Sequence, residues 1–178
     1  KVDYPLYLCT DSGLMSCNTV EESVERAIQG GVSVVQLREK EASSRELFEL
    51  AKRVKRVTDK YDVPLIINDR LDICLAVDAA GVHLGQTDLP CSEARRILGA
   101  EKIIGVSAAT PEEAAKAQSD GADYLGVGAV FATSTKTNTR PVTAETIRAI
   151  RSAVDIPFVV IGGVNSENIS GLHGLGIN

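Results

Sequence analysis

The chain has 178 residues, of which 44% are hydrophobic and 24% charged, so it holds apolar material for one core but not comfortably for two. Lys and Arg number 19 against 24 Asp and Glu, a net charge of −5, and no basic run stands out, which excludes general affinity for nucleic acid or anionic membranes. No apolar stretch approaches the roughly 20 residues that cross a bilayer, and the first residues lack the apolar core of a signal peptide. We therefore expect a cytoplasmic protein.

Apolar, β-branched runs of strand length recur along the chain, and segments with helical periodicity separate most of them. The predicted strands cover residues 6–10, 33–38, 64–68, 81–85, 102–106, 124–130 and 158–161. Hydroxyl residues followed three positions later by Glu predict helix starts at Thr19, Ser43 and Thr110. In the second helix, apolar residues recur at spacings of three and four, and we interpret the basic residues of 52–56 as a solvated face.

Alternation of strands and helices permits either an open doubly wound sheet or a closed (β/α)₈ barrel. No G-x-G-x-x-G turn follows the first strand, polar residues follow many successive strands, and Gly-rich strand ends recur late in the chain, which together favour the barrel. After Ile161 the sequence predicts only a helical segment from Ser166 to about Leu175 and the approach to another strand. We predict an α/β protein, one TIM (β/α)₈ barrel domain over residues 1–178, C-terminally incomplete because the eighth strand and the closing helix are lacking.

Alternating polar side chains lead out of the second predicted strand. Gln36, Arg38 and Lys40 point to one side of it. Gln36 is suited to hydrogen-bond a heterocycle, whereas Arg38 and Lys40 are suited to neutralise a polyphosphate. Alternatively, Arg38 pairs with Glu39 or Glu41 at the surface. Because inward-facing Gln and Arg are costly unless they are used, we favour a binding site.

Two acidic residues follow neighbouring predicted strands. Asp69 and Asp88 each lie on the loop just beyond a strand, within reach of a common hard cation. Two carboxylates with phosphate oxygens and water suit Mg²⁺. Loop carboxylates also cap helices and turns, so the spacing alone leaves both interpretations open. His83 lies within an apolar run and is interpreted as a packing residue rather than a catalytic one.

Hydroxyl-rich and Gly-rich segments follow the later strands. Ser107 follows the fifth predicted strand, where it meets a ligand or forms a turn. The long segment 131–141 is crowded with hydroxyls and is suited to wrap an anion, although a mobile linker is the alternative. Within it Thr133, Ser134 and Thr135 would bind a phosphate monoester and Lys136 would offset further charge. The pair Gly162 and Gly163 would let backbone amides approach the same phosphate.

Six motifs, in this order at strand ends, resemble those of the thiamin phosphate synthase family. They are Gln36-Leu37-Arg38-Glu39-Lys40, Asn68-Asp69-Arg70, His83-Leu84-Gly85-Gln86 with Asp88, Gly105-Val106-Ser107, Thr133-Ser134-Thr135-Lys136 and Ile161-Gly162-Gly163-Val164. The resemblance implies a Mg²⁺-dependent TIM-barrel enzyme that joins hydroxymethylpyrimidine diphosphate to hydroxyethylthiazole phosphate and releases diphosphate. It also implies a dissociative reaction that needs no protein nucleophile.

The resemblance assigns the expected site residue by residue. Substrate binding falls to Gln36, Arg38, Lys40, Asn68, Ser107 and Lys136 for the pyrimidine diphosphate, and to Thr133, Ser134, Thr135 and Gly163 for the thiazole phosphate. Leu37 and Glu39 are further substrate-binding residues. The catalytic contribution falls to Arg38, Lys40, Ser107 and Lys136, and the Mg²⁺ ligands are Asp69 and Asp88. A thiazole tautomerase of the same superfamily and a non-catalytic phosphate-binding module are the alternatives. The expected partners are small molecules, and the sequence leaves the oligomeric state open.

Overall fold

The computed structural model describes residues 2–131 and 141–178. The described chain divides into two compact units, and each is treated by itself below. Unit 1 takes in the chain up to His83 together with Ile97–Ile103, and unit 2 takes in Leu84–Arg96 and Ile104–Asn178. The assignment of residues 1–178 to one domain stays a prediction.

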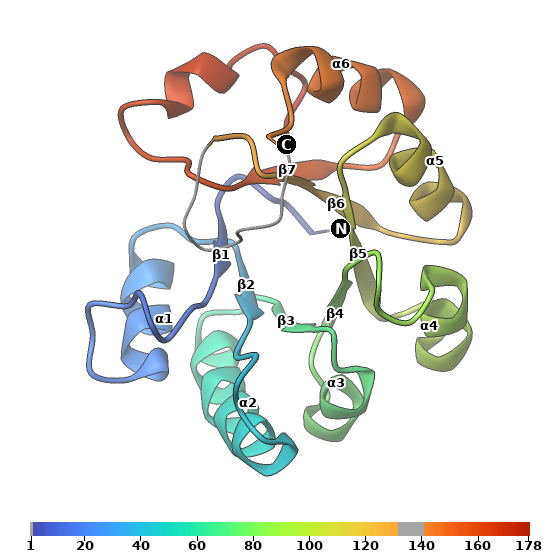
Figure 1. Ribbon diagram of the computed structural model, residues 1–178. Coiled ribbons are helices and arrows are strands. Elements are labelled where there is room, and N and C mark those ends of the chain that lie inside the picture. The colour runs from blue at the N-terminus through green and yellow to red at the C-terminus, as the bar shows by residue number, and fades with distance from the viewer. Residues whose placement is uncertain (1, 132–140) are drawn as a thin grey trace. The chain divides into compact units, whose positions relative to one another are not determined.

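Unit 1 consists of parallel strands that alternate with helices (Figure 1). Strand β1 pairs with β2, β2 with β3 and β3 with β4, all in parallel, and Ile103 at the start of β5 continues the pattern by donating its N–H to the carbonyl of Ala80. The side chains of β2 and β3 are almost wholly buried, as a parallel sheet covered by helices requires. The elements are β1 (Tyr7–Cys9), α1 (Val20–Gln29), β2 (Val34–Leu37), α2 (Ser44–Lys60), β3 (Leu65–Asn68), α3 (Leu71–Val77) and β4 (Gly81–Leu84).

The helix starts predicted from hydroxyl caps are confirmed. The Thr19 hydroxyl accepts a hydrogen bond from the Glu22 amide, and the Thr110 hydroxyl accepts one from the Glu113 amide. At Ser43 the capping box is complete, because the Glu46 carboxylate also accepts from the Ser43 amide at 2.9 Å. The apolar stripe of α2 is buried through Leu47, Ala51 and Val54.

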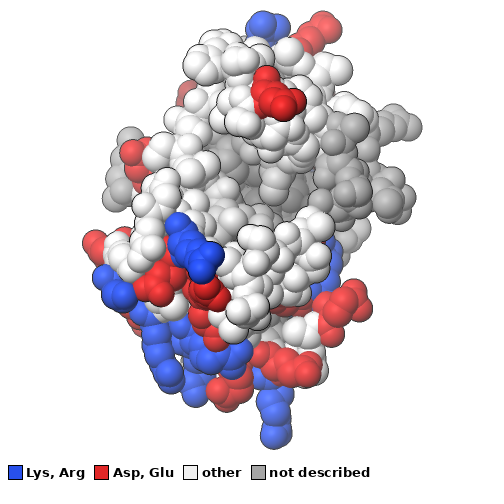
Figure 2. Space-filling model, turned by 90° about the vertical axis from the view of Figure 1, so that its left-hand side faces the viewer, with Lys and Arg blue, Asp and Glu red and all other residues white. Residues whose placement is uncertain are grey.

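The basic residues of α2 form ion pairs at the surface of unit 1, which confirms the solvated-face interpretation. Arg53 pairs with Glu21 of α1, and Lys60 pairs with Glu25 at 2.7 Å. Figure 2 shows Lys and Arg side chains interleaved with Asp and Glu on this face rather than one continuous positive patch. Exposed pairs of this kind each contribute at most about 1 kcal/mol, so they align α1 and α2 without dominating their packing.

Unit 2 carries the remaining alternation of strands and helices. Strand β5 pairs in parallel with β6, and β6 with β7, so that Gly105 lies opposite Tyr124 and Leu125 opposite Phe158. A side chain at Gly105 would collide with the Tyr124 ring, which explains the glycine there. The elements are α4 (Cys91–Leu98), β5 (Ile103–Ala108), α5 (Pro111–Ser119), β6 (Tyr124–Gly128), α6 (Ala144–Ala153), β7 (Phe158–Ile161) and the 3₁₀ helix η1 (Ile169–Leu172).

Most strand bounds differ from the predictions by one or two residues, and two differences change the interpretation of predicted residues. Strand β5 continues to Ala108, so Ser107 lies within the strand and not beyond it. The predicted helix from Ser166 to about Leu175 is only the four-residue η1. Gly174 and Gly176 adopt positive φ angles of 76° and 74°, which an α-helix does not accommodate. At the predicted approach to a further strand, the Asn178 amide donates to the Phe158 carbonyl at 3.1 Å.

The Ser43 capping box gives a stability prediction. We expect Ser43→Ala to lower the free energy of unfolding by about 1 kcal/mol, because the Glu46 amide at the start of α2 loses the hydroxyl that accepts its hydrogen bond. Arg45→Ala, at an exposed position of the same turn, is the control and should leave the stability nearly unchanged. Chemical denaturation measures both variants, and equal midpoints for the two would show that the cap does not stabilise α2.

Candidate functional site

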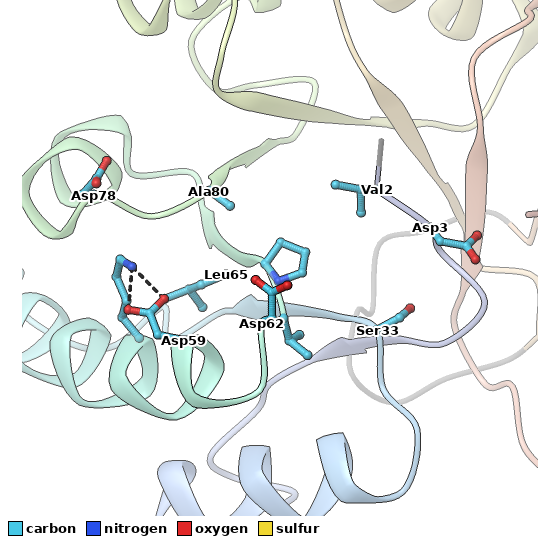
Figure 3. A pocket seen from close by; sticks show the side chains of 11 residues that line it. Val2, Asp3, Ser33, Asp59, Asp62, Leu65, Asp78 and Ala80 are labelled. Atoms are coloured by element: carbon cyan, nitrogen blue, oxygen red, sulfur yellow. Dashed lines mark hydrogen bonds and ion pairs between the residues drawn. The ribbon is translucent and has the colours of Figure 1, made fainter.

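One cavity of unit 1 lies at the amino ends of the strands. Its volume is about 520 Å³, and Ser33, Leu65 and Ala80 on its wall lie at or just before the starts of β2, β3 and β4 (Figure 3). Lys55 is held there by both carboxylate oxygens of Asp59, at 2.8 Å each. In parallel α/β barrels the amino ends of the strands carry stability and the carboxyl ends carry chemistry. We therefore look for the site at the other end.

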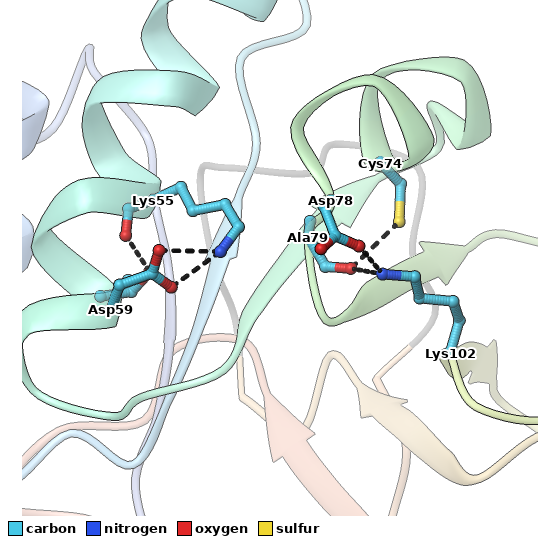
Figure 4. Close-up of polar contacts among 7 residues, drawn as sticks. Lys55, Asp59, Cys74, Asp78, Ala79 and Lys102 are labelled. Carbon is cyan, nitrogen blue, oxygen red and sulfur yellow. Dashed lines mark hydrogen bonds and ion pairs between the residues drawn. The ribbon is translucent and has the colours of Figure 1, made fainter.

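Polar contacts beside this larger cavity fix the start of β4 (Figure 4). The Lys102 ammonium donates to the Asp78 carboxylate at 2.5 Å and to the Ala79 carbonyl at 2.7 Å, and that carbonyl also accepts from the Cys74 thiol. Hydrogen bonding to Lys102 lowers the pKa of Asp78, whereas burial raises the pKa of the Cys74 thiol to about 11. All four cysteines are free thiols, and Cys74 and Cys91 are buried.

The smaller cavity of unit 1, which we call the β2–β3 cavity, lies at the carboxyl ends of those strands. Its volume is about 180 Å³. Glu39 and Lys40 follow β2, Asn68 ends β3, and Asp69 comes directly after it. The parallel register that sets Leu37 opposite Ile67 brings these strand ends together. The cavity therefore unites four sequence-predicted residues, and its remaining walls come from Ala42, Leu47 and Arg70.

Asp69 is held in a tight turn at the mouth of β3. Its φ angle is 61°, a left-handed conformation that is uncommon for residues other than glycine and that Asp tolerates better than most. The Arg70 amide donates to the Asn68 carbonyl across it at 2.8 Å, and the Asp69 amide donates to the His83 carbonyl at 2.9 Å. Such backbone geometry clusters at functional sites because it fixes where a side chain points. His83 itself is buried, in agreement with a packing role.

Arg70 forms a fixed cationic wall of the same cavity. Its guanidinium donates to both oxygens of Asp72, at 2.9 and 2.5 Å, and to the Ser44 hydroxyl at 2.9 Å. Hydrogen bonding from Arg70 lowers the pKa of Asp72, so this partner stays ionised. These hydrogen bonds hold the guanidinium of Arg70, the residue that follows Asp69, in one position.

The polar residues that lead out of β2 differ in their surroundings. Gln36 is buried, and its amide donates to the Tyr7 hydroxyl at 2.8 Å and accepts from the Cys9 thiol. Arg38 pairs with Asp11, whose carboxylate lies 3.8 Å from its guanidinium, and not with Glu39 or Glu41 as the alternative expected. The side chain of Leu37 is only 1% exposed, so only its backbone is available to a ligand.

Sequence reasoning missed the segment after β1 that supports this site. The hydroxyls of Thr10 and Ser12 donate to the Glu39 carboxylate, at 3.3 and 2.6 Å respectively. The Arg38 amide in turn donates to the Thr10 hydroxyl at 3.0 Å. A usable signal was present, because Thr-Asp-Ser follows a strand at the same end as the other site residues.

In unit 2, Asp88 and Ser107 contribute to local structure at strand ends. One Asp88 carboxylate oxygen accepts from the Gly85 amide at 2.6 Å, so Asp88 does cap a turn, the alternative that the sequence left open. The backbone carbonyl of Ser107, which lies within β5, accepts a hydrogen bond from the Gln86 side chain at 2.6 Å. These contacts orient both residues. They do not involve the second carboxylate oxygen of Asp88, which stays a candidate metal ligand.

The strand ends after β6 and β7 hold the last predicted residues. Gly162 and Gly163 have positive φ angles of 101° and 66°, which favour glycine, and the Gly163 carbonyl accepts from the Asn168 side chain at 2.8 Å. Thr133, Ser134, Thr135 and Lys136 lie outside the described residues. Within residues 2–131 and 141–178, no group of three or more His, Cys, Asp and Glu side chains is arranged to hold a metal ion, and no helix there suits a membrane span.

Comparison with known proteins extends over nearly the whole chain. The profile of the family described as thiamine monophosphate synthase matches residues 6–178. A thiamine-phosphate synthase of Clostridium botulinum is 55% identical over 178 residues, which are 100% of this chain and 84% of that protein. One of Ruminiclostridium cellulolyticum is 58% identical over 177 residues, 99% of this chain and 84% of that protein.

Solved structures show the same fold. A thiamine phosphate pyrophosphorylase from Pyrococcus furiosus superposes with a TM-score of 0.87 at 40% identity, covering 96% of this chain and 81% of that one. An N-acetylmannosamine-6-phosphate 2-epimerase from Clostridium perfringens, at 16% identity and a TM-score of 0.66, shares the fold alone. The predicted TIM-barrel class is thereby confirmed, with seven parallel strands among the described residues.

These comparisons define an enzyme of the TIM-barrel class. The chain belongs to the thiamine monophosphate synthase family and is an enzyme of thiamine biosynthesis. The tautomerase and the non-catalytic module are not favoured, because relatives that match the full chain at this identity are synthases.

The left-handed turn at Asp69 gives the first prediction for this site. We expect Asp69→Val to be less stable than Asp69→Asn by about 1–2 kcal/mol, because a β-branched side chain resists a positive φ whereas Asn accepts it. Equilibrium unfolding in urea measures the difference. Equal stabilities would mean that the turn relaxes without cost and does not fix the direction of the Asp69 side chain.

The buried thiol of Cys74 gives a second prediction, on the pH dependence of stability. Its pKa of about 11 exceeds the usual value of 9.0, so the unfolded chain releases this proton first and the free energy of unfolding falls as the pH rises from 9 to 11. We expect Cys74→Ala to have a shallower alkaline loss of stability, measured by denaturation at pH 8, 9, 10 and 11. Cys17→Ala, at a partly exposed thiol, is the control and should retain the wild-type slope.

Proposed function

We propose that this chain catalyses the condensation of 4-amino-2-methyl-5-hydroxymethylpyrimidine diphosphate with hydroxyethylthiazole phosphate. The bond between the methylene carbon and the diphosphate oxygen breaks, and its electron pair leaves with diphosphate. The electron-rich aminopyrimidine ring stabilises the resulting cation, and the thiazole nitrogen then donates its lone pair to form the new carbon–nitrogen bond. The membership in the synthase family and the cation-lined β2–β3 cavity support this reaction.

Cationic side chains of unit 1 would stabilise the leaving diphosphate. Arg38 and Lys40 both follow β2, and Arg can engage two phosphate oxygens whereas Lys acts as a point charge. Placed where negative charge develops, such groups each lower the barrier by about 2–4 kcal/mol. Asn68 and Gln36 would bind the pyrimidine, and the run Leu37 to Glu39 would line it, with the Leu37 backbone making any direct contact.

The donor chemistry at the carboxyl end of β3 fits Mg²⁺. The β2–β3 cavity offers hard oxygen donors from Asn68 and Asp69, and Mg²⁺ prefers one or two carboxylates with substrate phosphates and retained water. Asp69 and Asp88 would hold the ion. When bound, it would supply charge neutralisation of the diphosphate. The turn at Asp69 supports this role, because its left-handed backbone conformation constrains the direction of the side chain.

The thiazole phosphate would be bound by residues of the later segments. Thr133, Ser134 and Thr135 would donate hydroxyl and amide hydrogens, and the Gly163 backbone would approach the same phosphate. Ser107 and Lys136 would bind the pyrimidine diphosphate and offset its charge. The small-molecule substrates fit an enzyme that works in the cytoplasm, and this location is part of the proposal.

Replacing the Asp69 carboxylate tests the proposal. We expect Asp69→Asn to lose Mg²⁺-dependent formation of thiamin phosphate by about 100-fold or more in kcat/KM, because a ligand charge at the diphosphate is removed. Product formation is followed by chromatography with both substrates present. A thiazole tautomerase would hardly change, because its reaction does not involve the diphosphate.

The chain offers a matched control at Asp62. This residue also has a positive φ, of 54°, and it lines the larger cavity at the amino ends of the strands. Asp62→Asn therefore makes the same chemical change in the same backbone conformation and should retain activity. If wild-type protein with Mg²⁺ and both substrates yields no thiamin phosphate, or if both variants lose activity equally, the proposal is wrong.

A further inference from the structure

The Glu39 carboxylate is turned toward the segment after β1. Its Oε2 accepts from the Ser12 hydroxyl at 2.6 Å, and its Oε1 accepts from the Thr10 hydroxyl at 3.3 Å. Both carboxylate oxygens of Glu39 thus accept hydrogen bonds from hydroxyls of the same segment. A carboxylate in the middle of a cationic run would repel a diphosphate, so its engagement by two hydroxyls reduces that repulsion.

Thr10 connects Glu39 with the backbone of Arg38. The Thr10 side chain is buried, with the residue only 7% exposed, and its amide donates to the Gln36 carbonyl at 2.9 Å. Its hydroxyl accepts from the Arg38 amide at 3.0 Å while it donates to Glu39. One hydroxyl therefore satisfies a donor and an acceptor on consecutive residues, which fixes the chain direction at the end of β2.

The same segment places an anion beside the Arg38 guanidinium. Asp11 accepts from the Gly13 amide at 3.0 Å through Oδ1, and the Leu14 amide donates to the Asp11 carbonyl at 3.0 Å. These local bonds direct its other carboxylate oxygen to within 3.8 Å of Arg38 Nη1. At this distance the pair orients the guanidinium without a strong hydrogen bond, so an incoming phosphate can replace Asp11.

We infer that Glu39 is a positioning residue: it anchors the Thr10–Ser12 segment, and through that segment it fixes the backbone and the guanidinium of Arg38 for the diphosphate. The inference rests on the proposed function for the identity of the ligand. It assigns to Glu39 a role through Thr10, Ser12 and Asp11 beyond the lining of the pyrimidine. The residues that carry it all belong to unit 1.

Steady-state kinetics with both substrates separates this role from a structural one. We expect Glu39→Ala to raise the KM for the pyrimidine diphosphate about tenfold while the KM for the thiazole phosphate and the melting temperature change little. Glu39→Gln keeps one acceptor oxygen and the side-chain shape, so it should recover most of the affinity. Glu41→Ala, at an exposed neighbour, is the matched control and should behave as wild type.

Calorimetry with inorganic diphosphate and Mg²⁺ makes the result independent of turnover. Glu39→Ala should weaken diphosphate binding by the same factor. Thr10→Val should also weaken it, and the variant with both substitutions should bind diphosphate little worse than either single variant. The inference is overturned if Glu39→Ala binds diphosphate like Glu41→Ala, or if kcat falls with KM unchanged. Absence of thiamin phosphate formation by the wild type would instead overturn the proposed function, and diphosphate binding would still decide the role of Glu39.

Discussion

The parallel register of β2, β3 and β4 is the constraint on which the site depends. Because Leu37 lies opposite Ile67 and Asn68 opposite His83, the residues that follow β2 and β3 are brought to the same end of the sheet. Buried strands on either side leave no freedom to slip, since a shift by one residue would move every side chain of a strand to the opposite face of the sheet. Lys40 after β2 and Asp69 after β3 therefore line one cavity because backbone hydrogen bonds hold their two strands side by side.

Hydrogen bonds from neighbouring residues, rather than burial, hold charged side chains of the β2–β3 cavity in position. Arg70 is held by Asp72 and Ser44, and Glu39 is held by Thr10 and Ser12. These two side chains have their hydrogen-bonding partners in place before any ligand arrives, so they need little reorganisation when a polyphosphate binds. This preorganisation is what a reaction without a protein nucleophile requires, because the enzyme then contributes position and electrostatic stabilisation.

Much of this was accessible from the sequence, and the exceptions have physical causes. Strong local signals, such as the Ser43 cap and the apolar strands, predicted elements that the structure contains. The end of β5 and the four-residue η1 differed because tertiary pairing extends a strand and positive-φ glycines stop a helix. The partners of Glu39 and Arg38 escaped prediction because Thr10–Ser12 lies about 27 residues away in the chain, and only the fold brings them together. Asp88 showed that a turn cap and a candidate ligand can be the same residue.

The central claim is that negatively charged oxygens of the substrate bind where β2 and β3 end. A crystal structure of the protein with Mg²⁺ and inorganic diphosphate tests it most directly. The account predicts diphosphate density in contact with Arg38 and Lys40, with Asp69 turned to the metal. Density confined to the larger cavity beside Asp59 and Asp62, with the β2–β3 cavity left empty, would contradict it.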